Sequence, residues 1–174
     1  FNRKPQVIVS DSSQDLSPDW SPDGNKIVFY SFGGSNSGMR TISREAMTGK
    51  WNDPILKLDH SGAHPRYSPD GNSILYMGLG FHIIPSSEGS EQILLKTSDT
   101  NLHRIMFPVW SEDGSKIFFR GKTKSQHYWE FWSLDLKSKE VKKVINVDNP
   151  NEPLDFGIFK TDGDRFYFFR PEYD

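Results

Sequence analysis

One phrase recurs along this 174-residue chain, and each copy is built around an Asp-Gly pair. Three copies resemble one another closely and a fourth is degenerate: SPDWSPDGNKIVF (17–29), AHPRYSPDGNSILY (63–76), FPVWSEDGSKIFF (107–119) and DFGIFKTDGDRFYF (155–168). A catalytic motif is normally present once in a chain. Four copies therefore indicate a repeated architecture before they indicate chemistry.

Each copy has the composition of a tight hairpin between two short strands. An aromatic residue precedes the turn, and a run of β-branched and aromatic residues follows it, as in Ile27-Val28-Phe29. The turn residues suit chain reversal, because Pro presets φ, Asp bonds to local backbone and Gly accepts positive φ. We therefore expect each Asp-Gly pair to join the first two strands of a unit, with Gly71 at positive φ.

The remaining part of each unit has the composition of two further strands. Third strands are expected at about 39–43, 81–85 and 129–135, and outer strands at 53–59, 90–97 and 139–147. The segment 3–10 fits the outer-strand slot as well. Strand-rich units that repeat every ~40–50 residues are typical of propeller blades, each a sheet of about four strands.

The predicted fold class is therefore all-β: a β-propeller with about four antiparallel blades in this chain. The expected organisation begins with an outer strand of a closing or preceding blade and ends with a partial blade: 1–12, 13–62, 63–103, 104–151 and 152–174. Either segment 3–10 closes a small ring, or the chain is an arc of a larger propeller. Because residue 1 is Phe rather than Met, we expect a chain processed or cut from something longer.

The recurring phrase resembles the signature of TolB-like β-propeller repeats, which are related to WD-repeat propellers. Trp20-Ser21-Pro22-Asp23-Gly24 and Tyr67-Ser68-Pro69-Asp70-Gly71 match it almost letter for letter, whereas Glu112 replaces Pro in the third copy. The resemblance covers essentially the whole chain and implies a periplasmic or otherwise extracytoplasmic binding module. A lipoprotein of the cell envelope is the kind of partner it implies. One fold hosts many functions, so the resemblance indicates fold more strongly than activity.

Composition excludes several classes of function. The chain has no cysteine, so disulfides and thiolate metal sites are impossible. Its net charge of −2 provides no basic field for nucleic acid. No apolar run approaches the ~20 residues that a membrane-spanning helix needs. Hydrophobic content is 34%, but an aromatic share of 14% supplies large side chains for a core.

No catalytic motif is present in the sequence. The nearest approach to Gly-x-Ser-x-Gly is Gly34-Ser35-Asn36-Ser37-Gly38, which has Asn at the position of the nucleophile. His60, His64 and His103 fall in loops that would converge at one mouth of a propeller channel, where imidazoles can hold a metal. We nonetheless expect no cofactor, no bound metal and no catalytic residue. We interpret the aromatic segment 127–132 as a strand that packs on the next blade. The lysines of 137–143 are interpreted as the solvated edge of an outer hairpin.

The sequence leaves two classes of function open. The preferred hypothesis is a non-catalytic module that binds a protein or small polar ligand at the channel mouth. The alternative is an enzyme: a propeller-type polysaccharide lyase with a histidine metal site, or the propeller domain of a larger hydrolase. Aligning the repeats predicts a binding cluster at the start of the first strands: Asp15, Asp19, His64, Arg66, His103 and Arg104.

Overall fold

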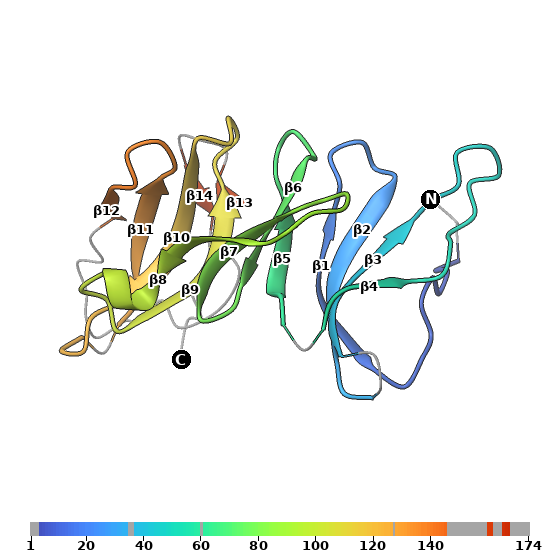
Figure 1. Ribbon diagram of the computed structural model, residues 1–174, viewed down its shortest axis with the longest axis horizontal. Helices are drawn as coiled ribbons and strands as arrows, with labels where there is room; N and C mark the ends of the chain where they lie inside the picture. The colour runs from blue at the N-terminus through green and yellow to red at the C-terminus, as the bar shows by residue number, and fades with distance from the viewer. Residues whose placement is uncertain are drawn as a thin grey trace.

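The computed structural model describes residues 4–34, 37–59, 61–126, 128–145, 160–161 and 165–167. Three four-stranded antiparallel sheets follow one another along the chain and lie side by side (Figure 1). Sheet 1 contains β1 (Gln14–Trp20), β2 (Lys26–Phe32), β3 (Gly38–Ser43) and β4 (Ile55–Asp59). Sheet 2 contains β5 (Ala63–Tyr67), β6 (Ser73–Met77), β7 (Gly80–Pro85) and β8 (Gln92–Lys96). Sheet 3 contains β9 (Arg104–Trp110), β10 (Lys116–Lys122), β11 (Glu130–Asp135) and β12 (Val141–Ile145).

The strands of each sheet pair in chain order, so every sheet is a simple meander. A short pair, β13 (Lys160–Thr161) and β14 (Phe166–Tyr167), forms a further antiparallel ribbon. The other regular element in the described part is a single 3₁₀ turn, η1 (Thr97–Asp99). The all-β fold class predicted from the repeats is confirmed, and the third and outer strands lie where their composition placed them.

The Asp-Gly turns join the first two strands of each sheet, as the sequence predicts. Gly24, Gly71 and Gly114 have φ of 71°, 74° and 70°, which is the left-handed region that glycine occupies without strain. The fourth pair, Asp162-Gly163, lies outside the described residues. The recurring phrase therefore forms the hairpin turn between the first two strands in all three copies that the structure describes.

Each sheet has two apolar faces, and the core lies between sheets. We call the face directed toward the next sheet the forward face and the other the back face. Val28 and Met39 of the forward face of sheet 1 pack against the back face of sheet 2, formed by Tyr67, Ile74, Tyr76 and Ile84. The same arrangement joins sheets 2 and 3: Leu75, Phe81 and Leu95 pack against Ile117, Phe119 and Leu134. Ring pairs contribute, since Phe81 and Phe119 meet edge to face at 5.0 Å.

The segment expected to form an outer strand at 3–10 differs from that expectation. Residues 4–10 form no strand and pair with none in the described part of the chain. Ile8 and Val9 instead pack on the back face of sheet 1, against Ile27, Phe29 and Ile42. Apolar side chains of a segment without a ladder partner are stabilised by burial on the nearest apolar face, and sheet 1 provides one.

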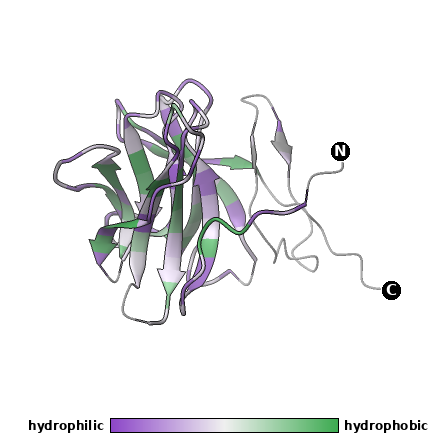
Figure 2. Ribbon diagram, turned by 90° about the vertical axis from the view of Figure 1, so that its right-hand side faces the viewer, coloured by the Kyte–Doolittle hydropathy of each residue, from purple (hydrophilic) through white to green (hydrophobic). Residues whose placement is uncertain are grey.

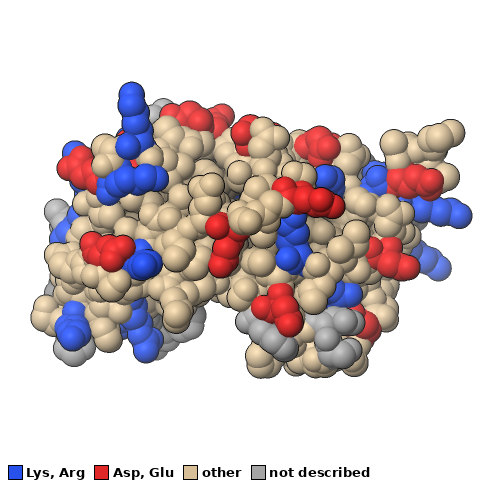
Figure 3. All heavy atoms as spheres, viewed as in Figure 1, with Lys and Arg blue, Asp and Glu red and all other residues tan. Residues whose placement is uncertain are grey.

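Charges of both signs are dispersed over the surface seen in Figure 3, in agreement with the small net charge. Continuous apolar runs lie within the strands, as in Ile27–Phe29 of β2, and Figure 2 shows such hydrophobic stretches from the side of sheet 1. Among the described residues, no helix has the length and apolarity needed to cross a membrane.

Candidate functional site

The first strands of the three sheets contact one another, β1 with β5 and β5 with β9, and we call them the inner strands. Each inner strand is interrupted by a β-bulge at the same place in the repeat. The residues at the three bulges are Ser17, His64 and Phe107, with φ of 52°, 52° and 55°. Each precedes a proline in the sequence.

A left-handed backbone is uncommon for a residue with a side chain, and costs roughly 1–2 kcal/mol relative to glycine. Here it occurs at three equivalent positions, so the surrounding sheets impose it repeatedly. Strained residues of this kind concentrate at functional sites. The three bulges therefore define the candidate site, and we call their side chains the bulge row.

The bulge row is continuous across the three sheets. Ser17 Oγ lies 2.9 Å from His64 Nδ1, within hydrogen-bond distance, and joins sheet 1 to sheet 2. The His64 ring meets the Phe107 ring edge to face, with centroids 4.7 Å apart, and joins sheet 2 to sheet 3. The guanidinium of Arg120 lies 5.8 Å from the centroid of Phe107, close enough for a cation–π contact.

Polar contacts beside the row also cross between sheets. Arg66 Nη1 donates across to the carbonyl of Ser17 at 3.4 Å, and within its own strand to the carbonyl of Pro65 at 2.8 Å. The Asp19 carboxylate accepts the backbone N–H of Tyr67 at 2.9 Å. Trp110 Nε1 donates to the carbonyl of Arg66 at 3.3 Å. These bonds fix the inner strands relative to one another and keep the row aligned.

Burial sets the charge state of the row. The pKa of His64 is lowered from its ordinary value of 6.5, first by burial and then by the neighbouring Arg66 charge, so the imidazole is neutral at pH 7. Burial also lowers the pKa of Arg66, while Asp19 opposes that change. The row thus presents a hydroxyl, a neutral imidazole and an aromatic ring. These groups can hydrogen-bond and stack with a polar ligand.

The structure brings three of the six predicted site residues together and leaves three apart. Asp19, His64 and Arg66 lie around the row. Asp15 belongs to a different cluster, where it accepts from Ser31 Oγ at 2.6 Å and lies 4.0 Å from Arg40 Nη1. His103 and Arg104 are exposed at the start of β9, and His103 N donates to the carbonyl of Lys122.

Sequence reasoning missed Ser17 and Phe107, although a signal for both was present. Ser17, His64 and Phe107 each lie six residues before the Asp of their Asp-Gly pair and directly before a proline. Counting back from the turn therefore pairs His64 with Phe107 rather than with His103. A metal site was a further possibility for the histidines. Within the described ranges, no group of three or more His, Asp or Glu side chains is placed to hold a metal ion.

The fold belongs to the β-propeller class, as solved structures show. TolB from Acinetobacter baumannii superposes with a TM-score of 0.63 at 20% identity, covering 79% of this chain and 34% of that chain. A puromycin hydrolase gives 0.63 at 15% identity, covering 80% and 23%. The β-propeller domain of the Trilobed protease from Pyrococcus furiosus gives 0.51 at 18% identity, covering 76% and 42%.

These likenesses support a TolB-like propeller fold for this chain. The chain spans about a third of the length of the Acinetobacter TolB and less than a quarter of the hydrolase. No family model matches the sequence, and no curated protein matches it either.

Proposed function

We propose that this chain is part of a non-catalytic propeller module that binds a protein or a small polar ligand at the bulge row. The observation that carries the proposal is the row itself: three strained, half-buried side chains at equivalent positions touch one another across all three sheets. The sheets need the bulged backbone at each position, but nothing in the repeat requires Ser, His and Phe there. Three different side chains on one repeated backbone are suited to recognition.

Two further inferences accompany this proposal. The TolB resemblance favours a protein partner and an extracytoplasmic location. Of the six predicted binding residues, we retain Asp19, His64 and Arg66 beside the row and add Ser17 and Phe107. His103 and Arg104, at the start of β9, are retained as contacts for a ligand large enough to extend beyond the row.

The proposal is tested by ligand binding to matched variants. A panel of amino acids, acidic and basic peptides and oligosaccharides is titrated against the protein, with chemical shifts of the His64 imidazole as the readout. The dissociation constant of any ligand that perturbs His64 is then measured by isothermal titration calorimetry. His64→Ala and Phe107→Ala should each bind that ligand at least about fivefold more weakly than the parent chain, corresponding to ~1 kcal/mol for an interface contact. Lys142→Ala is the control, because Lys142 is exposed on β12 and pairs with Glu140.

Binding that persists in both row variants but is lost in Lys142→Ala would place the site on the outer strands and contradict the proposal. A manganese ion retained through dialysis, and lost in His64→Ala, would contradict the non-catalytic assignment instead. That result would favour the polysaccharide lyase alternative.

A further inference from the structure

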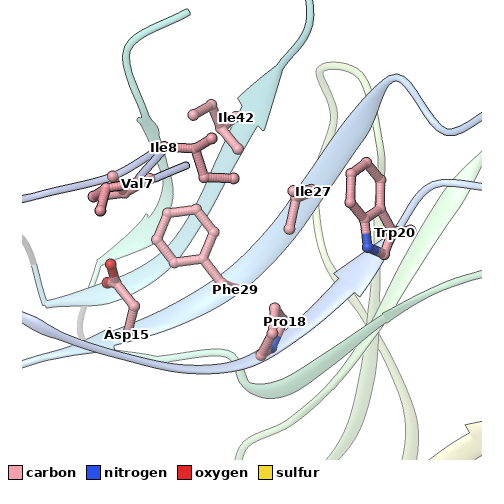
Figure 4. Close-up of a pocket in the computed structure, with 9 residues that line it drawn as sticks. Val7, Ile8, Asp15, Pro18, Trp20, Ile27, Phe29 and Ile42 are labelled. Atoms are coloured by element: carbon pink, nitrogen blue, oxygen red, sulfur yellow. The ribbon is translucent and has the colours of Figure 1, made fainter. Parts of the chain in front are cut away.

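Two hollows in the described part of the molecule have similar volumes but different chemistry. The one shown in Figure 4, about 380 Å³, lies between residues 7–9 and the back face of sheet 1. Trp20, Ile27 and Phe29 line it, and Asp15 is its one charged group. The other, about 320 Å³, lies between the Asp-Gly turns of sheets 1 and 2, and we call it the turn cleft. Polar groups line most of the turn cleft, so it is the one suited to a polar ligand.

Two carboxylates line the turn cleft, Asp23 from sheet 1 and Asp70 from sheet 2. Each Oδ1 is engaged within its own turn, where it accepts a serine hydroxyl and the backbone N–H two residues further on. Each Oδ2 accepts the side-chain amide of the following asparagine, at 3.3 Å in sheet 1 and 3.0 Å in sheet 2. The hydroxyl bonds from Ser21 and Ser68 are the largest cause of the lowered pKa of the two carboxyls, which are therefore ionised at pH 7. A carboxylate oxygen has two lone pairs, so each Oδ2 can accept a further bond from a ligand.

A buried hydroxyl also lines the turn cleft. Tyr67 is 6% exposed and its ring packs in the core, but its Oη has no hydrogen-bond partner among the described residues. Burial raises the pKa of this phenol to about 12, and the charges of Asp19 and Asp23 raise it further. Because Asp23 lines the cleft from the other sheet, its effect on the phenol indicates that Oη is directed toward the cleft. An unpaired hydroxyl in the core costs free energy, and a ligand that bonds to it would remove that cost.

The cleft between the turns of sheets 2 and 3 provides an internal comparison. Its volume is about 400 Å³, and Asp70, Asp113 and Trp110 line it. Trp110 stands where sheet 2 has Tyr67, and its Nε1 already donates to the carbonyl of Arg66. An indole N–H is a donor only, so this aromatic residue has no polar capacity left. The repeat thus places two carboxylates in both clefts, but an unpartnered hydroxyl in the turn cleft alone of these two.

The charges around the turn cleft favour a cation. Lys26 lines it, so the lining carries two carboxylates and one ammonium. A second lysine nearby, Lys57, donates to the backbone carbonyls of Ser86 and Ser87 and is therefore already bonded to the chain. Both charged groups that act on the pKa of Tyr67 are carboxylates, so the unpartnered hydroxyl lies in negative surroundings.

We propose that the turn cleft binds a primary ammonium group, carried by a small amine or by the lysine side chain of a peptide. An ammonium has three N–H donors, and the cleft offers acceptors on three different side chains: Asp23 Oδ2, Asp70 Oδ2 and Tyr67 Oη. A guanidinium instead prefers both oxygens of one carboxylate, and each Oδ1 is engaged in its turn. The site lies at the turns rather than at the bulges, so it is independent of the bulge row.

The proposal is tested with butylammonium as the probe, titrated into ¹⁵N-labelled protein with the amide shifts of Gly71 and Asn72 as the readout. Asp23→Asn should raise the dissociation constant at least about tenfold, since it removes a charge-assisted bond. Tyr67→Phe, which removes one neutral acceptor, should raise it at least about threefold. Asp113→Asn is the matched control, because Asp113 makes the equivalent bonds with Ser111 and Ser115 but lines the other cleft. Its dissociation constant should equal that of the parent chain.

Two further variants separate binding from structure. Tyr67→Phe keeps the ring in the core, and its urea unfolding without probe should show no loss of stability, because the hydroxyl removed has no partner. Lys26→Met should bind butylammonium more tightly, because it removes a like charge from the lining. A destabilised Tyr67→Phe with an unchanged dissociation constant would overturn the proposal. Weaker binding by Lys26→Met, equal binding by the parent chain and Asp23→Asn, or the same shifts with butanol would also overturn it.

A second probe, Nα-acetyl-lysine amide, distinguishes the two sources of the ammonium group. A dissociation constant equal to that of butylammonium would assign the cleft to small amines. One at least about tenfold lower would show that peptide groups contribute as well, and would assign it to a lysine of a protein partner. The absence of saturable shifts with either probe would overturn the proposal.

Discussion

The Asp-Gly turns and the bulges both repeat in all three sheets, but they repeat in different ways. In the turns, backbone and side chains recur together: the buried hydroxyl of Ser21, Ser68 or Ser111 donates to the following Asp Oδ1 at 2.6, 2.6 and 2.7 Å. In the bulges, φ recurs within a few degrees while the side chain changes from Ser17 to His64 to Phe107.

The difference follows from where the side chains form their contacts. Turn side chains bond within their own turn: Ser68 Oγ accepts the N–H of Ser73 at 2.9 Å, and Asp70 Oδ1 accepts that of Asn72 at 3.0 Å. Every turn therefore needs the same Ser and Asp side chains. Bulge side chains contact the next sheet instead, so each position can differ while the backbone stays fixed. The turns, whose side chains are the same in every sheet, form the structural part of the repeat. The bulges, whose side chains differ on a shared backbone conformation, form its candidate site.

The largest effect should come from breaking a turn. Gly71→Val places a β-branched residue at φ 74° and sets its Cβ 3.4 Å from Pro22 Cδ. We expect the free energy of unfolding, measured with urea, to fall by ~1–2 kcal/mol or more. Gly114→Val should lose a similar amount, because its φ is 70°. A neutral Gly71→Val would show that the turns do not share one mechanism.

The turns and strands could be predicted because their signals are local. Pro-Asp-Gly, the preceding aromatic and the apolar run after it lie within about a dozen residues, and short-range sterics decide the outcome. The sequence did not reveal that Ser21, Ser68 and Ser111 are buried turn anchors. Their role depends on bonds that form once the hairpin has closed.

The bulges and the N-terminal segment could not be predicted in the same way. A bulge changes the register by one residue and leaves the apolar alternation on both sides almost intact. Residues 4–10 have strand composition, but whether they pair depends on a partner strand elsewhere in the fold. The candidate site was therefore found in part. Asp19, His64 and Arg66 were predicted from the alignment of the repeats. Phe107 has the same spacing to its Asp-Gly pair as His64, but the bulge that makes this position special is seen only in the register of β9.

A smaller effect should come from the bond between the first two members of the bulge row. A double-mutant cycle with Ser17→Ala and His64→Ala should give a coupling energy of ~0.5–1.5 kcal/mol, as expected for one hydrogen bond. The measurement is urea unfolding of the two single variants and the double variant. Ser17→Ala with Lys142→Ala should show no coupling, since Lys142 lies on β12. Additive effects of Ser17→Ala and His64→Ala would mean that the row is not held together in solution.

The smallest effect concerns the pH dependence of stability, to which the bulge row and the turns contribute in different pH ranges. Because the pKa of His64 is lowered, the unfolded chain binds a proton below pH 6.5 that the folded chain resists, and stability falls as pH drops through that range. Hydrogen bonds from Ser111 and Ser115 lower the pKa of Asp113 from 3.8 to about 2, so the contribution of Asp113 to stability is present above pH 3.8 and is lost as the pH falls toward 2.

His64→Asn should therefore flatten the stability profile between pH 7 and 5 (about the range in which an imidazole titrates) and leave the acid limb unchanged. Asp113→Asn should alter only the acid limb below about pH 4. Thermal unfolding of the three proteins across pH measures both, and a His64→Asn profile parallel to that of the parent chain would show that the imidazole is not buried in the row.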